Sequence, residues 1–517
     1  MTTSPAPATP PLEIDGRSLA LEDFRRVVVG GVPCRLAAEA RERVAAGRRV
    51  VERVLGTAEA VYGLNTGFGD LASVRIPADR LAALQERLIK SHAAGMGEPL
   101  DDRAVRGMLL LRANTLARGH SGVRVEVVER LLDMLAHDML PVVPSRGSVG
   151  ASGDLAPLAH LALPILGGGR VRFEGREMPS AEALARCGLA PLALAPKEGL
   201  ALINGTQAMT ALLALAVLEA RRLVKVADLA GALSTDALRG TDAAFDARLH
   251  RLRPHPGQQA SAANLWRLLQ GSAIRESHRV GDVRVQDPYS LRCMPQVHGA
   301  VRDLVVDVER KLAVEMNSVT DNPLVFDDGA GGGELISGGN FHGEPMALAA
   351  DVLAIALAEL ASISERRTEK LTNTAFSGLP PFLVEEAGLN SGFMIAQVTA
   401  AALVSENKVL CHPASVDSIP TSADKEDHVS MGMGAALKLG SVVANVQRVL
   451  AIELLAAAQG IDLLRPLTSS PPLEALHATV RERVAPWVED REMAPDLAAA
   501  EELLAGGDLA PHLEPLD

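Results

Sequence analysis

The sequence predicts a mainly α-helical protein, built on a bundle of long helices with a smaller mixed α/β part on its N-terminal side. Apolar residues make up 48% of the chain, which is enough for a large core. Four long stretches carry apolar residues at the i, i+3, i+4 spacing of a helix: residues 301–316, 346–372, 391–410 and 435–464. Because ordinary helices have about 11 or 12 residues, packing these helices side by side is the simplest way to bury their apolar stripes.

The N-terminal elements are short, and glycines separate several of them. Alternation of apolar and charged residues predicts strands, and helical periodicity predicts helices. In chain order we expect a strand at 12–14, helices at 21–28 and 36–55, a loop at 61–70, helices at 81–90, 104–118 and 123–136, a glycine-rich stretch at 146–155, a helix up to 166, and a β-hairpin that begins at 170–174.

A turn at residues 204–207 precedes an apolar helix at 208–227 and the long helices. The chain then closes with short helices around residues 473–484 and 497–504. We therefore divide the chain into four segments: a flexible tail at 1–11, a mixed α/β part at 12–203, the central bundle at 204–468, and C-terminal short helices at 469–517.

Composition excludes several classes of function. A net charge of -13 argues against nucleic-acid binding, which needs clustered Lys and Arg. The four cysteines are far apart, so they indicate neither disulfides nor a zinc ribbon. The tail lacks the features of a signal peptide, and polar residues interrupt the apolar runs before they reach the roughly 18 residues that a membrane span needs. We expect a cytoplasmic protein with no membrane contact.

The glycine-rich stretch contains Gly147, Gly150 and Gly153 around Ala151 and Ser152. Glycine permits tight turns and close backbone approach. Asp154 is predicted to be the N-cap of the following helix. A phosphate-binding loop is disfavoured, because no Lys follows as a P-loop requires. An Ala-Ser-Gly turn can instead cyclise: the Gly153 nitrogen can reach the Ala151 carbonyl, and Ser152 can lose water, which would leave an electrophilic methylene group.

Polar loops between the predicted helices supply candidate binding groups. Arg292 can clamp a carboxylate through its planar guanidinium, Asn204 and Gln286 can donate amide hydrogen bonds, and Glu426 can hold a cationic group. The chain has only two tyrosines, Tyr62 and Tyr289, and both lie in loop-like segments. A tyrosine with a lowered pKa can act as a general base. We find no metal-ligand spacing among the thirteen histidines, no nucleophile elbow and no nucleotide motif.

These pieces together resemble the aromatic amino-acid ammonia-lyase family, and within it the histidine-specific branch, from about residue 12 to about residue 464. The segments that carry the resemblance are Gly-Ser-Val-Gly-Ala-Ser-Gly-Asp-Leu-Ala-Pro-Leu-Ala from 147, Tyr-Gly-Leu-Asn-Thr-Gly-Phe-Gly (62–69), Asn-Gly-Thr-Gln (204–207), Gln-Asp-Pro-Tyr-Ser-Leu-Arg (286–292), Asn-Ser-Val-Thr-Asp-Asn-Pro (317–323) and Gly-Asn-Phe-His (339–342). Several motifs in the right order are far more specific than any one alone.

The resemblance implies a fumarase/aspartase-like helical bundle, a homotetramer, and elimination of ammonia from an L-amino acid. It implies that Ala151, Ser152 and Gly153 form a 4-methylideneimidazole-5-one (MIO) group, with no metal or nucleotide. In the roles that it implies, Tyr62 removes the β-proton, Arg292 and Asn204 bind the carboxylate, Tyr289 and Gln286 line the MIO pocket, and Phe341 stacks near the substrate ring.

Substrate choice depends on few residues. His92 and Glu426 resemble the specificity positions of histidine-specific lyases, and leaving two such groups unpaired against a phenyl ring would cost roughly 1–3 kcal/mol each. We therefore expect L-histidine to be converted to trans-urocanate and ammonia. Three positions depart from the histidine-specific pattern, namely Met294, His298 and Lys425.

Three alternatives remain open. The first is an MIO-dependent tyrosine or phenylalanine ammonia-lyase, or an aminomutase. The second is a non-enzymatic helical assembly protein. The third is a lyase of the fumarase and aspartase type, which shares the helical bundle but has no MIO.

Overall fold

A computed structural model describes residues 10–57, 61, 63–67, 74–282, 284–330 and 332–517. The chain divides into two compact units. Unit 1 contains residues 1–215, 309–350 and 413–437, and unit 2 contains 216–308, 351–412 and 438–517. Four of the five boundaries between the units fall inside long helices, and the fifth lies in a loop after residue 412. The segment boundaries that we inferred along the sequence stay a prediction.

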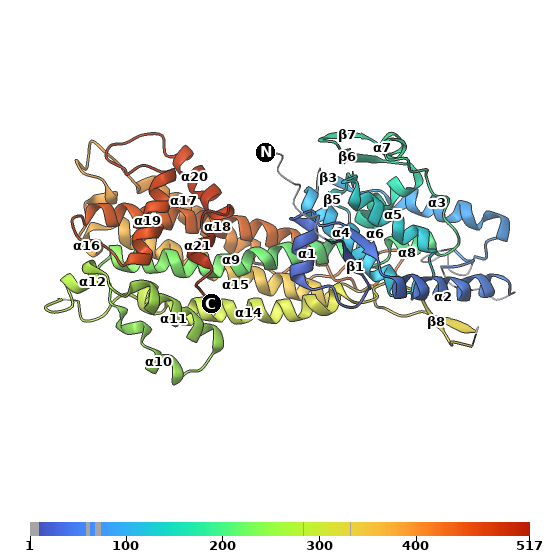
Figure 1. Cartoon of the computed structure of the whole chain (residues 1–517), viewed down its shortest axis with the longest axis horizontal. Coiled ribbons are helices and arrows are strands. Elements are labelled where there is room, and N and C mark those ends of the chain that lie inside the picture. Colours follow the sequence, from blue (N-terminus) through green and yellow to red (C-terminus); the bar gives the residue numbers. More distant parts are fainter. Residues whose placement is uncertain (1–9, 58–60, 62, 68–73, 283, 331) are drawn as a thin grey trace, which may run out of the picture. The chain divides into compact units, whose positions relative to one another are not determined.

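Unit 1 is the mixed α/β part (Figure 1). Its first half contains β1 (Leu12–Ile14), α1 (Leu21–Val28), β2 (Cys34–Leu36), α2 (Ala38–Leu55), α3 (Leu81–His92), β3 (Met96–Pro99), α4 (Asp102–Ala117), α5 (Val125–Ala136), β4 (Leu140–Pro141) and β5 (Pro144–Arg146). Its second half contains α6 (Leu155–Ala162), β6 (Arg170–Phe173), β7 (Arg176–Pro179), α7 (Ser180–Arg186), α8 (Glu198–Ile203), β8 (Leu324–Asp327) and β9 (Gly333–Ile336).

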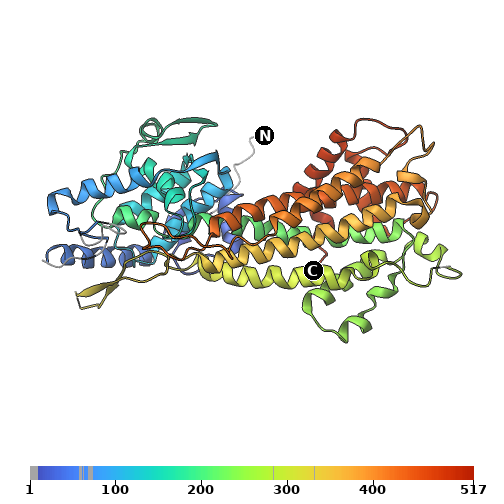
Figure 2. The ribbon, with the colours of Figure 1, turned by 180° about the vertical axis from the view of Figure 1, so that it is seen from behind.

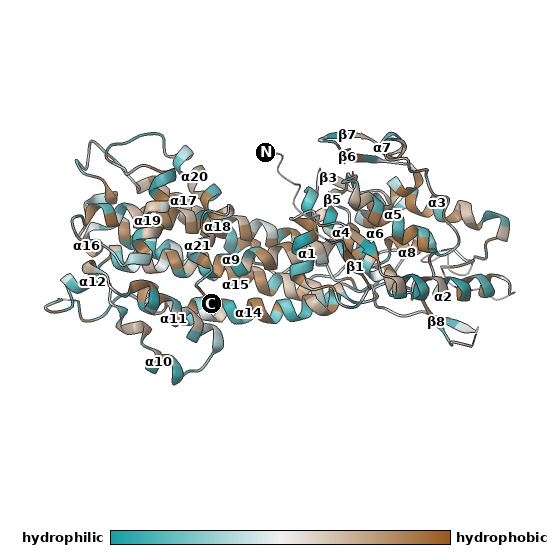
Figure 3. Cartoon of the chain, viewed as in Figure 1, coloured by the Kyte–Doolittle hydropathy of each residue, from teal (hydrophilic) through white to brown (hydrophobic). Residues whose placement is uncertain are grey.

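The strands of unit 1 form small sheets at its surface. β1 pairs with β2 in parallel, whereas β3–β5, β4–β6–β7 and β8–β9 are antiparallel. The core lies around α4, which packs against α1, α2, α5 and α6. Nearly every residue of α4 is buried, including the polar residues Arg112 and Asn114, because other elements of unit 1 pack around it. Helix α2 instead alternates between brown and teal in Figure 3, because only one of its faces packs inward.

Unit 2 is all helical among its described residues. Its elements include parts of α9 (Gln207–Ala237), α14 (Met294–Met316), α15 (Glu344–Thr372) and α18 (Gly432–Leu463), which give the bundle its length. The shorter helices are α10 (Ala247–Arg251), α11 (Pro256–Leu269), α12 (Ala273–Ser277), α13 (Tyr289–Arg292), α16 (Thr374–Ser377), α17 (Met394–Leu410), α19 (Pro471–Arg483), α20 (Ala494–Ala505) and α21 (Ala510–Leu513).

Within unit 2, α9, α14, α15 and α18 run side by side (Figures 1 and 2). Small and branched apolar residues fill the space between them, and a fully buried ion pair also joins two of them. Arg367 on α15 donates two hydrogen bonds to the carboxylate of Glu453 on α18. Ser234 on α9 donates to the same carboxylate at 2.7 Å. The ion pair therefore connects three of the four long helices.

By length and composition alone, two helices in the described part of the chain could cross a membrane: Glu344–Thr372 and Gly432–Leu463. Their most apolar windows are 67% and 78% buried within the fold. The core helices of soluble proteins have the same combination of length, composition and burial.

The predicted fold class is confirmed, and most predicted helices begin and end within three residues of their predicted bounds. Several elements differ. Helix α14 begins at Met294, seven residues before the predicted start at 301, and the strands β2 to β5, β8 and β9 were not predicted. Helix α9 continues to Ala237, ten residues beyond the predicted end, because apolar residues go on at helical spacing and Gly231 does not end the helix.

Helices α7, α8, α10, α12, α16 and α21 were missed because four to seven residues are too few to show periodicity. Helix α11 was also missed although it has 14 residues, since it begins with Pro and Gly and its large apolar residues lie only in its last five positions. Tyr289, expected in a loop, begins the short helix α13.

Candidate active site

One cavity in unit 1 contains most of the predicted site residues. Its volume is about 860 Å³, and its wall includes the end of α3, the start of α6 and the turn between α8 and α9. The predicted site residues in this wall are His92, Ala151, Ser152, Asn204, Phe341 and Glu426. The fold thus brings together side chains from distant parts of the chain.

The turn that carries Ala151 and Ser152 requires glycines at its bends. Gly150 and Gly153 have φ angles of +71° and +73°, in the left-handed region that favours glycine. A Cβ atom on Gly150 would collide with the Ser430 hydroxyl, and one on Gly153 would collide with the carbonyl oxygen of Gly205. The backbone of this turn therefore packs directly against neighbouring polar atoms.

The turn between α8 and α9 holds this segment from behind. The side-chain Nδ2 of Asn204 donates to the carbonyl oxygen of Ser152 at 3.0 Å. The backbone N–H of Asp154 donates to the carbonyl oxygen of Gly205 at 2.7 Å. Asn204 Oδ1 is buried and has no hydrogen-bond partner among the described residues. Asn204 is thus fixed on one side of its amide and has a spare acceptor on the other.

Asp154 precedes α6 as predicted, but its carboxylate does not cap that helix. It accepts a hydrogen bond from the Met209 backbone N–H at 2.9 Å and another from the Ser148 hydroxyl at 3.1 Å. The side chain is fully buried, and this desolvation raises its pKa to about 7 despite the hydrogen bonds, which lower the pKa. Asp154 therefore ties α6 to the start of α9.

Glu426 faces Ser152 across the cavity. The Ser152 hydroxyl donates to Glu426 Oε1 at 2.7 Å, and the hydroxyls of Thr421 and Ser422 donate to Oε2 at 2.7 and 2.8 Å. Partial burial raises the pKa of Glu426, but these three hydrogen bonds outweigh that effect and hold the pKa below its usual value. Glu426 is therefore an ionised hydrogen-bond acceptor at neutral pH.

The loop that presents Glu426 has an unusual backbone. Ser422, Ala423 and Asp424 have φ angles of +49°, +53° and +65° in succession. Such conformations cost free energy for residues other than glycine, and they persist where the surrounding structure enforces them, often at functional sites.

His92, at the end of α3, lies on the same cavity wall. Its Nδ1 lies 2.9 Å from the carbonyl oxygen of Leu88 and 3.1 Å from the Ser91 hydroxyl. Burial lowers the pKa of His92, although the Leu88 carbonyl and the charge of Glu426 oppose this effect. A neutral His92 bonded at Nδ1 keeps its second ring nitrogen for another partner.

Gln286, Tyr289 and Arg292 belong to unit 2, and none of them is in the wall of this cavity. The Tyr289 side chain is unusually open for an aromatic residue, with 69% of its surface exposed. The Arg292 guanidinium lies 4.6 Å from the centre of the Tyr289 ring, in cation–π contact. Arg292 Nε is buried and has no hydrogen-bond partner among the described residues.

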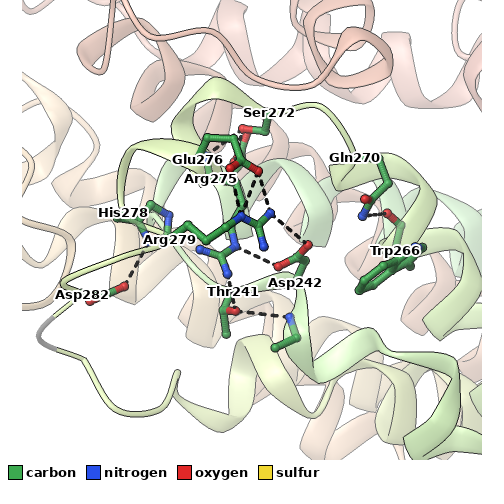
Figure 4. A network of polar contacts seen from close by, with 12 residues as sticks. Thr241, Asp242, Trp266, Gln270, Ser272, Arg275, Glu276, His278, Arg279 and Asp282 are labelled. Atoms are coloured by element: carbon green, nitrogen blue, oxygen red, sulfur yellow. Dashed lines mark hydrogen bonds and ion pairs between the residues drawn. The ribbon is translucent and has the colours of Figure 1, made fainter.

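Figure 4 shows a polar network of unit 2 around Arg275 and Asp242, and this network is linked to the segment that carries these residues through Thr241 and Asp287. Arg275 on α12 donates to Asp242 at 2.8 Å and to the Thr241 hydroxyl at 3.1 Å. The backbone N–H of Thr241 in turn donates to Asp287 at 2.6 Å. Behind the segment, Arg367 donates a long hydrogen bond of 3.4 Å to the Ser290 carbonyl. The start of α13 is therefore anchored on two sides within unit 2.

Tyr62 lies outside the described residues, although Gly67, Val74 and Ile76 from the same part of the chain are in the cavity wall. Among the described residues no group of His, Cys, Asp and Glu could hold a metal ion.

A family model described as aromatic amino acid lyase matches residues 19–482. The chain belongs to the aromatic amino acid lyase family. The predicted family is thereby confirmed, and as a member of the aromatic amino acid lyases the chain is a carbon–nitrogen lyase.

Individual aromatic amino acid lyases are similar over almost their whole length. A histidine ammonia-lyase of Sorangium cellulosum is 58% identical over 505 residues, covering 96% of this chain and 98% of the relative. The crystal structure of histidine ammonia-lyase from Trypanosoma cruzi has a TM-score of 0.90 at 46% identity, covering 98% of this chain and 95% of that one. A tyrosine aminomutase from Streptomyces globisporus has a TM-score of 0.92 at 37% identity, covering 98% and 99%.

Sequence reasoning missed several residues that shape the cavity or its support. The hydroxyls of Thr421 and Ser422 donate to Glu426. The sequence feature that could have indicated these bonds is the pair of hydroxyl residues five and four positions before the glutamate. Arg112 was also missed, although a lone arginine in the apolar run of residues 108–117 is conspicuous. His342 and His428 line the cavity with their rings 5.7 Å apart; His342 ends the Gly-Asn-Phe-His motif and His428 lies two residues after Glu426, but neither was given a role.

Proposed function

We propose that this chain eliminates ammonia from L-histidine and forms trans-urocanate. The observation that carries the proposal is the pairing of Ser152 with an ionised Glu426 and a neutral His92 in one cavity. An imidazole N–H can donate to Glu426 or to His92 Nε2, which is an acceptor because Nδ1 donates to the Leu88 carbonyl, whereas a phenyl ring would leave both acceptors unpaired. The similar histidine ammonia-lyases support the same substrate.

The residues at 151–153 fit an MIO group. Gly153 has no Cβ to obstruct ring closure, and Asn204 holds the Ser152 carbonyl while keeping a buried acceptor unpaired. Closure would join the Gly153 nitrogen to the Ala151 carbonyl carbon. One water leaves with the Ala151 oxygen and the amide hydrogens of Ser152 and Gly153. A second leaves with the Ser152 hydroxyl and its Cα hydrogen. The group supplies an electrophile that the ordinary side chains lack.

The side chains around this segment then bind and orient the substrate. Once Ser152 has lost its hydroxyl, Glu426 Oε1 loses that donor and becomes available to the imidazole, together with His92. Phe341 stacks near the ring, Asn204 and Arg292 bind the carboxylate, and Gln286 and Tyr289 complete the pocket. Tyr62 accepts the β-proton at its phenolate oxygen. We also propose that the working enzyme is a cytoplasmic homotetramer.

The direct test follows near-UV absorbance while the purified protein is incubated separately with L-histidine and L-tyrosine. The expected result is formation of a conjugated acid from L-histidine at a much larger kcat/KM. Turnover of L-tyrosine alone would favour the tyrosine lyase or aminomutase alternative. Full activity in a Ser152→Ala variant would favour a lyase of the fumarase and aspartase type.

A matched pair of loop variants tests the role of Glu426. Glu426→Gln removes one negative charge from the proposed imidazole site, and we expect kcat/KM for L-histidine to fall about tenfold to a hundredfold. Asp424→Asn removes the same charge two residues away, outside the cavity wall, and is expected to change kcat/KM little. Intact masses of both variants show whether residues 151–153 still lose two waters. Equal effects of the two substitutions would reject a specific role for Glu426.

A further inference from the structure

A fully buried arginine lies behind the turn that holds Ser152. Arg112 sits in the middle of α4 with none of its side chain exposed, among apolar residues. No carboxylate forms an ion pair with its guanidinium among the described residues, and its Nε and Nη2 have no hydrogen-bond partners there. The nearby carboxylate of Asp321 instead accepts a hydrogen bond from the buried Lys197 at 2.8 Å. Burying a cation without an ion-pair partner costs free energy, because the charge loses its hydration.

The hydrogen bonds of Arg112 go to the turn between α8 and α9. Its Nη1 donates to the carbonyl oxygen of Asn204 at 2.9 Å and to Gln207 Oε1 at 2.6 Å. The Gln207 amide is itself oriented, because its Nε2 donates to the hydroxyls of Thr115 and Thr320 at 3.1 and 2.8 Å. One guanidinium nitrogen therefore joins the first and last residues of the turn 204–207.

Between those two residues, Gly205 packs directly on the guanidinium. A Cβ atom at Gly205 would collide with Arg112 Nη1. The front of the same turn holds the reactive segment, through Asn204 Nδ2 to the Ser152 carbonyl and through the Gly205 carbonyl to the Asp154 N–H. The contacts thus run from Arg112 through Asn204 and Gly205 to residues 152–154.

We propose that Arg112 is a positioning residue for the Ala151–Gly153 segment. By fixing the Asn204–Gln207 turn, it holds the Ser152 carbonyl and the Gly153–Asp154 backbone in the arrangement from which the ring closes. The inference rests on the proposed function, because it assumes that this segment cyclises with loss of two waters. It assigns Arg112 no contact with the substrate.

The test compares Arg112→Met with Arg130→Met. Arg130 on α5 is a matched control: it is also buried, its Nη1 donates to the Ala190 carbonyl at 2.7 Å, and its Nε has no partner among the described residues. Each variant loses a buried guanidinium that binds a backbone carbonyl, but only Arg112 binds the turn 204–207. Folded protein is isolated by size exclusion, and its intact mass and thermal unfolding temperature are measured.

We expect wild type and Arg130→Met to have masses two waters below the encoded value. In Arg112→Met the dehydrated fraction of folded protein should fall about tenfold or more, since small displacements of reacting groups have effects of this size. Arg112→Lys, which keeps a donor without the planar fork, should be intermediate. Wild-type dehydration in folded Arg112→Met would overturn the proposal, as would an equal loss in Arg130→Met.

If Arg112→Met does not fold, the mass measurements on Arg112→Lys and Arg112→Gln test the proposal instead. Both keep a donor of different length, and both should fold with a dehydrated fraction below that of wild type. Wild-type dehydration in both would overturn the proposal. A separate result would contradict the proposed function. If the wild-type protein has lost two waters but does not act on L-histidine, the proposed substrate is wrong, and the mass measurements still test the role of Arg112.

Discussion

The proposed base, Tyr62, differs from phenylalanine by one hydroxyl group. Tyr62→Phe should lower kcat for L-histidine by about a hundredfold or more, because it removes a proton acceptor and little packing. Initial rates at saturating substrate measure the change. The intact mass should keep the deficit of two waters, which would show that ring closure does not need this hydroxyl. A turnover number close to that of wild type would exclude Tyr62 as the base.

Asp154 makes a prediction about stability and pH. Its pKa is about 7 in the folded protein and 3.8 when exposed, so the folded state binds a proton more tightly than the unfolded state. The free energy of unfolding should therefore decrease as pH rises from about 4 to about 7, by up to about 4 kcal/mol from this group, and then level off.

Urea unfolding of wild type and Asp154→Asn at several pH values tests this effect. Because Asp236 in unit 2 also has a raised pKa, of about 6, the quantity to compare is the difference between the two proteins. That difference should change with pH between about 4 and 7 and be constant above. A difference independent of pH would show that the Asp154 carboxyl is not protonated in the folded state.

Single residues differ in how far the sequence reveals them. No periodicity connects positions 92, 152, 204 and 426, so only the resemblance to known lyases grouped them before the structure. Asp154 has the residue type of a helix cap, but its carboxylate turns inward to Met209, which a local pattern cannot show. Arg112 was visible as an oddity in an apolar run, and its partners at 204 and 207 became known only from the fold.

At the level of helices, the buried pair Arg367–Glu453 should be important for the stability of unit 2. Glu453→Gln leaves the Arg367 guanidinium buried without its counter-charge and weakens the bond from Ser234. We expect the free energy of unfolding to fall by about 3–5 kcal/mol.

The control for that experiment is the partly exposed pair Arg465–Glu474. Glu474→Gln should cost no more than about 1 kcal/mol, since solvent screens such pairs. Chemical denaturation of the two variants measures both values. Equal losses would indicate that the buried pair contributes no more than a surface pair.

Elements were predictable where an apolar stripe or alternation marks them, and length alone did not decide, since the 14-residue α11 was missed. Helix α1 has the predicted bounds because a single apolar stripe ends at Val28 before two glycines. The long helices α15 and α18 were also found from their stripes. Helices of four or five residues, such as α12 and α13, depend on capping and packing by distant residues such as Asp236 and Arg367. Those partners are not encoded locally.

For the whole molecule, we expect the active site to be shared between copies of the chain. The cavity wall consists of unit 1 residues only, and Tyr289 is exposed on unit 2 with the partly buried Arg292 beside it. A side chain as open as that of Tyr289 is free to contact another copy of the chain. Co-expression of Tyr62→Phe with Arg292→Met should therefore restore activity, since mixed oligomers contain some sites with neither substitution.

Each variant alone should be inactive, and mixing the separately purified proteins without exchange of subunits should restore nothing. Light scattering gives the mass of the assembly in each sample. If co-expressed variants assemble and stay inactive, Tyr62 and Arg292 serve the same site from one chain.

The close approach of Gly153 to Gly205 also bears on how such an enzyme changes over evolution. The proposed electrophile consists of the backbone of residues 151–153 and the Cβ of Ser152, and the turn 204–207 holds it, whereas the groups assigned to the imidazole are side chains at the end of α3 and on the loop before α18. Different residues therefore determine the reactive centre and the substrate preference. Substitutions around His92 and Glu426 can change the preferred substrate while leaving the reactive centre intact. Directed evolution toward new amino-acid substrates can therefore start at these positions.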